Sequence, residues 1–190
     1  VELGYLGMAI TDFDGVYGLA RSWRALKNLQ KKGEGKDFCL IYGVEFHLEI
    51  DHEDPILTQD TLVLLAQNHQ GYINLNRLVS LSHCKSKNRA NIPLESLQNL
   101  NLEGLVALQP MRGRIRLGCE NLVIERILEL KRLFPENLYL VVSQHLHPAE
   151  DCWAECFIQL SKEFNISLLF SQDPFFHHRS RKDVSDLLHG

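Results

Sequence analysis

The sequence lacks the features that mark several specialised classes of protein. No apolar run approaches the roughly 20 residues needed to span a bilayer, and the N-terminus has neither the basic region nor the cleavage site of a signal peptide. No internal repeat, P-loop, dinucleotide-binding fingerprint or nucleophile elbow is present. These absences favour a globular protein without a membrane-spanning segment.

Cysteines are few and form no recognisable pattern. Their number is odd and they include no C-x-x-C pair, which is unlike a disulfide framework. We therefore expect reduced thiols in a cytoplasmic protein, and we interpret the cysteines as small apolar residues of the core. They are Cys39, Cys84, Cys119, Cys152 and Cys156.

Length and charge limit the size and the partners of the chain. Its 190 residues, of which 45% are hydrophobic, predict a single domain over residues 1–190 with one substantial core. A net charge of -4 gives no overall footprint for nucleic acid, so any contact with DNA belongs to a local patch or to other parts of a larger protein. Because the chain begins with Val1 rather than Met, we expect further residues upstream in the natural protein.

Short apolar runs alternate with segments of helical periodicity along the chain. This order is typical of parallel β/α units, in which helices cover the faces of a parallel sheet. The predicted strands begin with Met8-Ala9-Ile10 and continue at 38–50, 61–67, 105–108, 138–142 and 166–170, and the predicted helices are 17–32, 72–81, 94–100, 121–134, 151–164 and 182–188.

The stretch Thr11-Asp12-Phe13-Asp14-Gly15 follows the first apolar run. In parallel α/β proteins the end of a strand is where ligands and metals are held, so Asp12 and Asp14 are candidate site residues. An alternative stays open, in which Asp14-Gly15 is a tight turn and Asp12 caps the following helix.

The predicted strand 38–50 carries a second polar set. Glu45, His47 and Glu49 alternate along it and therefore share one face. A carboxylate beside an imidazole on one face of a sheet is a further candidate for chemistry.

Several motifs together identify a resemblance. Their order is TDFDGVYG, YGVE, LVLLAQNHQGYINLNRLVSLSH, EGLVAL, NLYL with QHL, and SQD. In this order they resemble the PHP domain of bacterial DNA polymerase III alpha subunits, including the error-prone branch, and the long LVLLAQN run is the most specific of them. The resemblance implies a distorted (β/α)7 barrel of the TIM-like type, whose first strand, with an H-x-H-S motif, lies before Val1.

The resemblance also implies a metal centre of up to three ions at the strand ends, held by His, Asp, Glu and Cys side chains. The positions that match ligands and keep a donor are Asp12, Glu45, His83 and Asp173.

Three other matching positions have lost their donor. Phe13 and Phe175 replace histidines and Met111 replaces a cysteine. Phenylalanine offers no donor and a thioether is a poor ligand for hard divalent ions. The four remaining residues suffice for one ion of Zn, Mn or Fe, but not for a multi-metal centre that activates water. We therefore expect a vestigial site filled by aromatic packing and no metal cofactor in this domain.

The function implied is that of one domain of a polymerase. The parent protein would be a nucleotidyltransferase that uses deoxynucleotides and Mg²⁺, and this domain would be a non-catalytic scaffold. Its partners would be the remaining polymerase domains, a separate proofreading exonuclease, and DNA through the parent protein. The alternative is that the domain is itself an enzyme, a metal-dependent 3′-5′ exonuclease or phosphoesterase, within a polymerase or standing alone.

Overall fold

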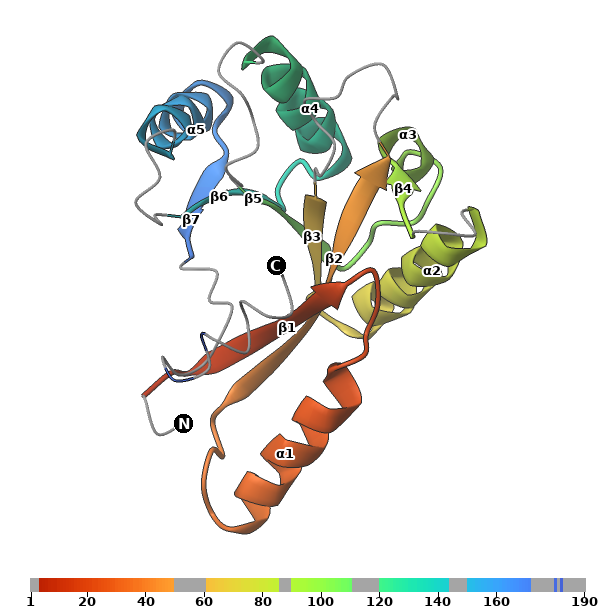
Figure 1. Ribbon diagram of the computed structural model, residues 1–190, viewed down its shortest axis with the longest axis vertical. Coiled ribbons are helices and arrows are strands. Elements are labelled where there is room, and N and C mark those ends of the chain that lie inside the picture. The colour runs from red at the N-terminus through yellow and green to blue at the C-terminus, as the bar shows by residue number, and fades with distance from the viewer. Residues whose placement is uncertain are drawn as a thin grey trace.

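One curved sheet with helices on its outer side forms the framework of the protein (Figure 1). The computed structural model describes residues 4–49, 61–85, 90–110, 120–143 and 150–171, with Ser180 and Lys182. The strands are β1 (Gly7–Phe13), β2 (Cys39–Glu49), β3 (Thr61–Ala66), β4 (Ile92–Pro93), β5 (Leu105–Pro110), β6 (Leu138–Val142) and β7 (Ser167–Phe170). The helices are α1 (Leu19–Lys31), α2 (His69–Lys85), α3 (Leu94–Leu97), α4 (Glu120–Leu133) and α5 (Glu150–Phe164).

The predicted strands and helices within the described residues are confirmed, with three main differences. α2 begins three residues earlier than predicted and ends four residues later, and α3 ends at Leu97, three residues before the end of the predicted helix 94–100. The two-residue strand β4 was not predicted. The predicted helix 182–188 lies outside the described residues, apart from Lys182.

The sheet is mostly parallel, and the prediction of parallel strands throughout is wrong for β3. The strand order is β1-β2-β3-β5-β6-β7, with β4 paired to β2, and β3 runs antiparallel to both β2 and β5. Only 11 residues separate β2 from β3, whereas a parallel crossover needs about a dozen or more. The continuous apolar run of β3 correctly indicated burial on both faces, but burial does not specify direction.

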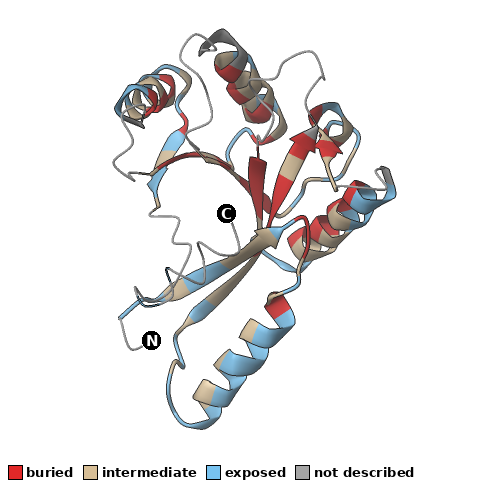
Figure 2. Ribbon diagram, in the orientation of Figure 1, coloured by how far each residue is buried: buried red, intermediate tan, exposed pale blue. Residues whose placement is uncertain are grey.

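The core lies between the sheet and the outer helices (Figure 2). Strand residues such as Val44, Leu64 and Leu140 meet helix residues such as Leu75 and Phe157 in one buried cluster. Among the described residues, no member of this cluster comes from β1 or α1. The N-terminal strand and helix therefore extend beyond the main core, and none of the described helices is long and apolar enough to cross a membrane.

The interpretation of the cysteines as core residues is wrong for three of them. Cys39, Cys84 and Cys152 are exposed, and Cys156 is partly buried against the core. On α5, Trp153 turns inward, and since adjacent helical residues point about 100° apart, Cys152 turns away from the core. Cys119 lies outside the described residues.

The long run at 62–83 includes the residues that pack the start of α2 closely against the loop before β5. Asn68 Oδ1 accepts a hydrogen bond from the Gly71 amide at 2.9 Å, and Asn74 Nδ2 donates to the Glu103 carbonyl at 2.9 Å. Gly104 has φ +74°, and a Cβ on Gly71 would lie only 1.9 Å from the Gly104 carbonyl oxygen. The asparagines and glycines of this run are therefore required for close backbone packing.

We expect Gly71→Ala to lower the free energy of unfolding by about 2–4 kcal/mol, because the methyl group would collide with backbone that cannot rotate away. Urea unfolding monitored by circular dichroism measures the effect. Ser80→Ala, on the exposed side of the same helix, is the control and should change stability by less than about 0.5 kcal/mol. Equal stability of the two variants would contradict the close contact.

Candidate functional site

Asp14 lies at the centre of the polar groups at the end of β1. Its backbone has φ +52°, the left-handed region that Asp tolerates better than most residues. The Asp14 amide donates to the Glu45 carbonyl of β2 at 2.8 Å. The turn after β1 is thereby fixed to the neighbouring strand, and Asp14 is buried, with 8% of the residue exposed.

The Asp14 carboxylate holds His47 of β2. Oδ1 accepts from the His47 backbone amide at 2.9 Å, and Oδ2 lies 2.5 Å from His47 Nδ1. Because an ionised carboxylate only accepts, the proton of this contact belongs to Nδ1 of the ring. The pair therefore fixes both the position and the tautomer of the His47 imidazole.

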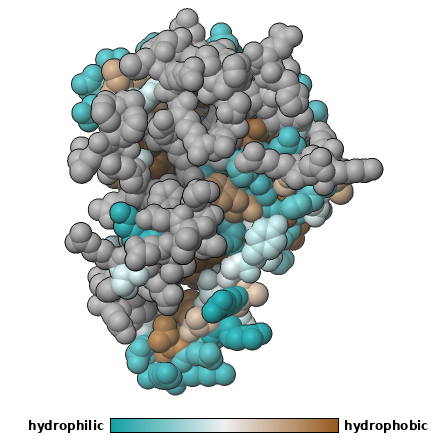
Figure 3. All heavy atoms as spheres, in the orientation of Figure 1, coloured by the Kyte–Doolittle hydropathy of each residue, from teal (hydrophilic) through white to brown (hydrophobic). Residues whose placement is uncertain are grey.

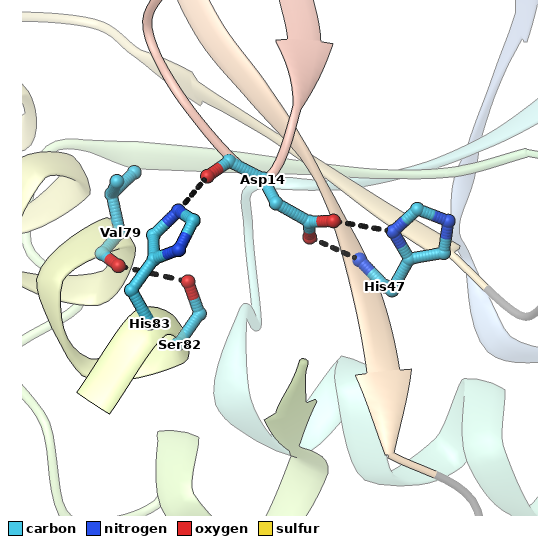
Figure 4. Close-up of polar contacts among 5 residues, drawn as sticks. All are labelled: Asp14, His47, Val79, Ser82 and His83. Atoms are coloured by element: carbon cyan, nitrogen blue, oxygen red, sulfur yellow. Dashed lines mark hydrogen bonds and ion pairs between the residues drawn. The ribbon is translucent and has the colours of Figure 1, made fainter. Parts of the chain in front are cut away.

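His83, near the end of α2, approaches Asp14 from the other side (Figure 4). Its Nε2 lies 2.8 Å from the Asp14 carbonyl oxygen, and its neighbour Ser82 donates to the Val79 carbonyl at 2.8 Å. A carbonyl oxygen cannot donate, so Nε2 must carry the proton. In this arrangement the Nε2 atom of His83 cannot serve as a metal ligand, since a ligating nitrogen needs its lone pair.

Phe13 covers the His47 ring. The two rings stack with centroids 5.1 Å apart and an interplanar angle of 25°. Phe13 remains 45% exposed. It therefore covers one face of the His47 ring without being a buried core residue.

The structure places two of the predicted ligands, Asp12 and Glu45, on opposite faces of the sheet. Asp12 accepts a hydrogen bond from the Gly18 amide, just before α1, at 2.5 Å. In the β1–β2 register Asp12 pairs with the core residue Val44, while Phe13 pairs with Glu45, so Asp12 and Glu45 lie on opposite faces. Glu45 is 3% exposed. Asp12 thus serves the start of α1, as the alternative interpretation proposed.

Three of the positions that the resemblance singled out, Asp173, Met111 and Phe175, lie outside the described residues. Within the described part of the chain, no group of three or more His, Cys, Asp and Glu side chains is arranged to hold a metal ion.

Sequence reasoning selected Asp14 and His47 separately but did not pair them. In the β1–β2 register Phe13 pairs with Glu45. Asp14, the residue after Phe13, therefore reaches the side chain of His47, which lies two positions beyond Glu45 on β2. Only the pairing of the two strands, which periodicity does not specify, brings them together.

Comparisons with known proteins identify relatives across the whole chain. The family model for the PHP domain matches residues 1–145. An error-prone DNA polymerase of Bdellovibrio bacteriovorus is 26% identical over 99% of this chain and 16% of its own length, and the DNA polymerase III subunit alpha of Escherichia coli K12 is 29% identical over 97% and 16%. The chain therefore spans about a sixth of the length of these relatives.

A solved structure supports the fold. An amidohydrolase from Chromobacterium violaceum, with bound sulfate and no metal, superposes with a TM-score of 0.52 at 14% identity, covering 88% of this chain and 76% of that one. At this identity the likeness concerns the fold alone.

We expect Asp14→Asn to lower the free energy of unfolding by about 1–3 kcal/mol, because charge-assisted hydrogen bonds to a buried group contribute in this range. A double-mutant cycle with His47→Gln should give a coupling energy of about 1 kcal/mol or more, measured by chemical unfolding. Asp37→Asn, at an exposed turn, is the matched control and should be nearly neutral. Additive effects of the Asp14 and His47 substitutions would contradict the pairing.

Proposed function

Because the chain belongs to the PHP domain family, we propose that it is the N-terminal domain of a polymerase III alpha-type DNA polymerase and acts there as a non-catalytic scaffold. The names of its relatives support the polymerase assignment, and so does their length, of which this chain matches about 16%. On this proposal nucleotidyl transfer with Mg²⁺ takes place in the rest of the protein during DNA replication.

The observation that carries the scaffold role is the use of site residues as hydrogen-bonding partners within the fold. His83 donates from Nε2 to the Asp14 carbonyl, and Asp12 accepts from the Gly18 amide. Phe13, where the family has a histidine ligand, stacks on His47. Atoms engaged in this way hold segments together, and a metal ion would have to displace those bonds before it bound.

The same hydrogen bonds explain how a domain without a metal centre would stay rigid. Asp14 joins the end of β1 to β2 and to α2 through four polar atoms. A metal ion bound by side chains from several strand ends would join the same segments. On this proposal Zn, Mn and Fe are absent from the domain, and Asp12, Glu45, His83 and Asp173 are remnants of a ligand set.

We further infer that the sheet belongs to a TIM-like barrel which an additional strand of the same protein completes. β1 and β7 are the two ends of the strand order, and both expose apolar side chains, including Met8 and Phe170. Exposed apolar edge strands are unfavourable in water unless another strand or a helix covers them. The fold of the amidohydrolase neighbour supports this arrangement.

The partners that follow from the scaffold role are the other domains of the polymerase. A separate proofreading exonuclease is a further partner for a domain whose own nuclease site is lost. These contacts would use the outer surface of the helices and not the strand ends, where the polar side chains are already engaged with one another.

Metal analysis tests the scaffold proposal. We expect less than about 0.2 equivalents of Zn, Mn and Fe by elemental mass spectrometry of the protein expressed with its native upstream residues and purified without chelator. We also expect no hydrolysis of a single-stranded oligonucleotide above the level of a His83→Ala variant. Phe13→His combined with Met111→Cys and Phe175→His is the positive control, since it restores three donors and should raise bound metal.

Two or more equivalents of metal in the unaltered protein, with hydrolysis that His83→Ala abolishes, would replace the scaffold role with that of a metal-dependent exonuclease. Failure of the triple variant to gain metal would contradict the placement of the site.

Hydrogen exchange tests the completed barrel. We expect the amides of β1 and β7 to exchange at least about tenfold more slowly in the protein with its native upstream residues than in the chain beginning at Val1, because a new partner strand protects edge amides. The amides of β5, which is paired on both sides, are the internal control. Unchanged exchange at both edges would contradict the added strand.

A further inference from the structure

α1 differs in charge from the rest of the chain. Residues 17–36 contain six of the 20 lysines and arginines but only one of the 24 acidic residues. This segment therefore carries a formal charge of +5 in a chain whose total is -4. The remainder of the chain is accordingly acidic, so the positive charge is a local feature.

The basic side chains of α1 lie on its exposed side. Arg21, Arg24, Lys27 and Lys31 are all exposed, and their spacing of three to four residues places them along one side of the helix. At 1.5 Å per residue they span roughly 15 Å. This length matches three to four consecutive phosphates of an extended single strand.

An aromatic ring accompanies these charges. Trp23 is 49% exposed, and the Lys27 ammonium lies over its ring, 5.8 Å from the ring centre. Burial of such a ring against the core would have been favourable, as it is for Trp153, which is 2% exposed. Trp23 instead remains at the border between the buried and the basic sides of α1.

The position of α1 makes this surface accessible. The helix lies at the end of the molecule away from α4 and α5 (Figure 1), and all of it beyond Leu19 is exposed or half-exposed (Figure 2). In the space-filling view, hydrophilic residues gather over this end (Figure 3).

We propose that the exposed side of α1 binds single-stranded DNA, with Arg21, Arg24, Lys27 and Lys31 contacting phosphates and Trp23 stacking on a base. A line of cations with an exposed aromatic ring is the combination that single-stranded DNA recognises without sequence preference. An acidic polypeptide would satisfy the charges but would leave Trp23 without a stacking partner. The acidic remainder of the chain would direct the strand to α1, because it repels phosphates elsewhere.

The inference deepens the proposed polymerase role by naming a surface that would guide DNA, but it can be tested separately. We expect fluorescence anisotropy to detect binding of the chain to a labelled 20-nucleotide oligo(dT) at low salt. The plot of log affinity against log salt concentration should have a slope of about -2 to -3, as expected for three to four phosphate contacts on a single strand.

Charge reversal locates the binding surface. The combined substitutions Arg21→Glu, Arg24→Glu and Lys27→Glu should weaken binding at least about tenfold. The matched control is Arg132→Glu with Lys162→Glu and Lys182→Glu, three exposed cations elsewhere, which changes the net charge equally and should retain most of the affinity. If reversal unfolds α1 by circular dichroism, the neutral variants Arg21→Gln, Arg24→Gln and Lys27→Gln replace it.

Tryptophan fluorescence tests the stacking. In a Trp153→Phe background, Trp23 is the one remaining tryptophan, and oligo(dT) should quench its emission in a saturable manner. Trp23→Ala should weaken binding by about fivefold or more, in keeping with the loss of one stacked base.

Three outcomes would overturn the inference. The first is equal loss of affinity in the two charge-reversal variants, which would mean that net charge alone drives binding. The second is equal or tighter binding of polyglutamate at matched charge, which would assign the surface to an acidic polypeptide. The third is tighter binding to a 20-base-pair duplex with no quenching of Trp23. None of these results depends on whether the domain is a scaffold or holds a metal.

Discussion

The hydrogen bonds of Asp14 are the interaction on which the arrangement of the site depends. A left-handed backbone at a residue other than glycine costs about 1–3 kcal/mol, so the conformation persists only because surrounding contacts compensate for it. The Asp14 amide, carbonyl and both carboxylate oxygens all have partners, which come from β2 and from α2. The strained turn, the pairing of β1 with β2 and the approach of α2 are therefore stabilised together, and each would weaken if Asp14 were replaced.

The same bonds determine what the site can do chemically. A metal centre needs several lone pairs directed at one point, whereas here His83 directs a proton at a carbonyl and His47 directs a proton at a carboxylate. Asp12 is directed toward the start of α1, on the face of the sheet opposite to Glu45. Asp12 and His83, which the sequence analysis selected as candidate ligands, are therefore engaged in hydrogen bonds within the fold, and Phe13 stacks on His47.

Sequence reasoning predicted the elements well and their mutual orientation less well. The boundaries of β6 were predicted without error because an apolar run enclosed by polar residues is a local signal. The direction of β3 was not, since a strand buried on both faces has the same pattern in either direction. The long motif at 62–83 identified the family, but its physical basis, the contact of Gly71 with Gly104, joins residues 33 apart and appears only once the chain is folded. The pairing of Asp14 with His47 has the same separation, and for the same reason periodicity did not reveal it.

The net charge of the whole chain also does not reveal the concentration of basic residues in α1. A net charge of -4 led to the expectation of no overall footprint for nucleic acid, whereas the segment that contains α1 carries charge of the opposite sign. The core explains why charge could become concentrated there: the buried cluster takes no residue from α1, so most positions of this helix are free to change without loss of core packing. A helix held by one buried residue, Leu19, gains little from being uniformly basic on its exposed side, because like charges three and four residues apart repel. The segment contains one acidic residue among residues 17–36, so this repulsion is not offset by neighbouring opposite charges. The repulsion favours an external anionic partner over a purely structural role for the basic side chains.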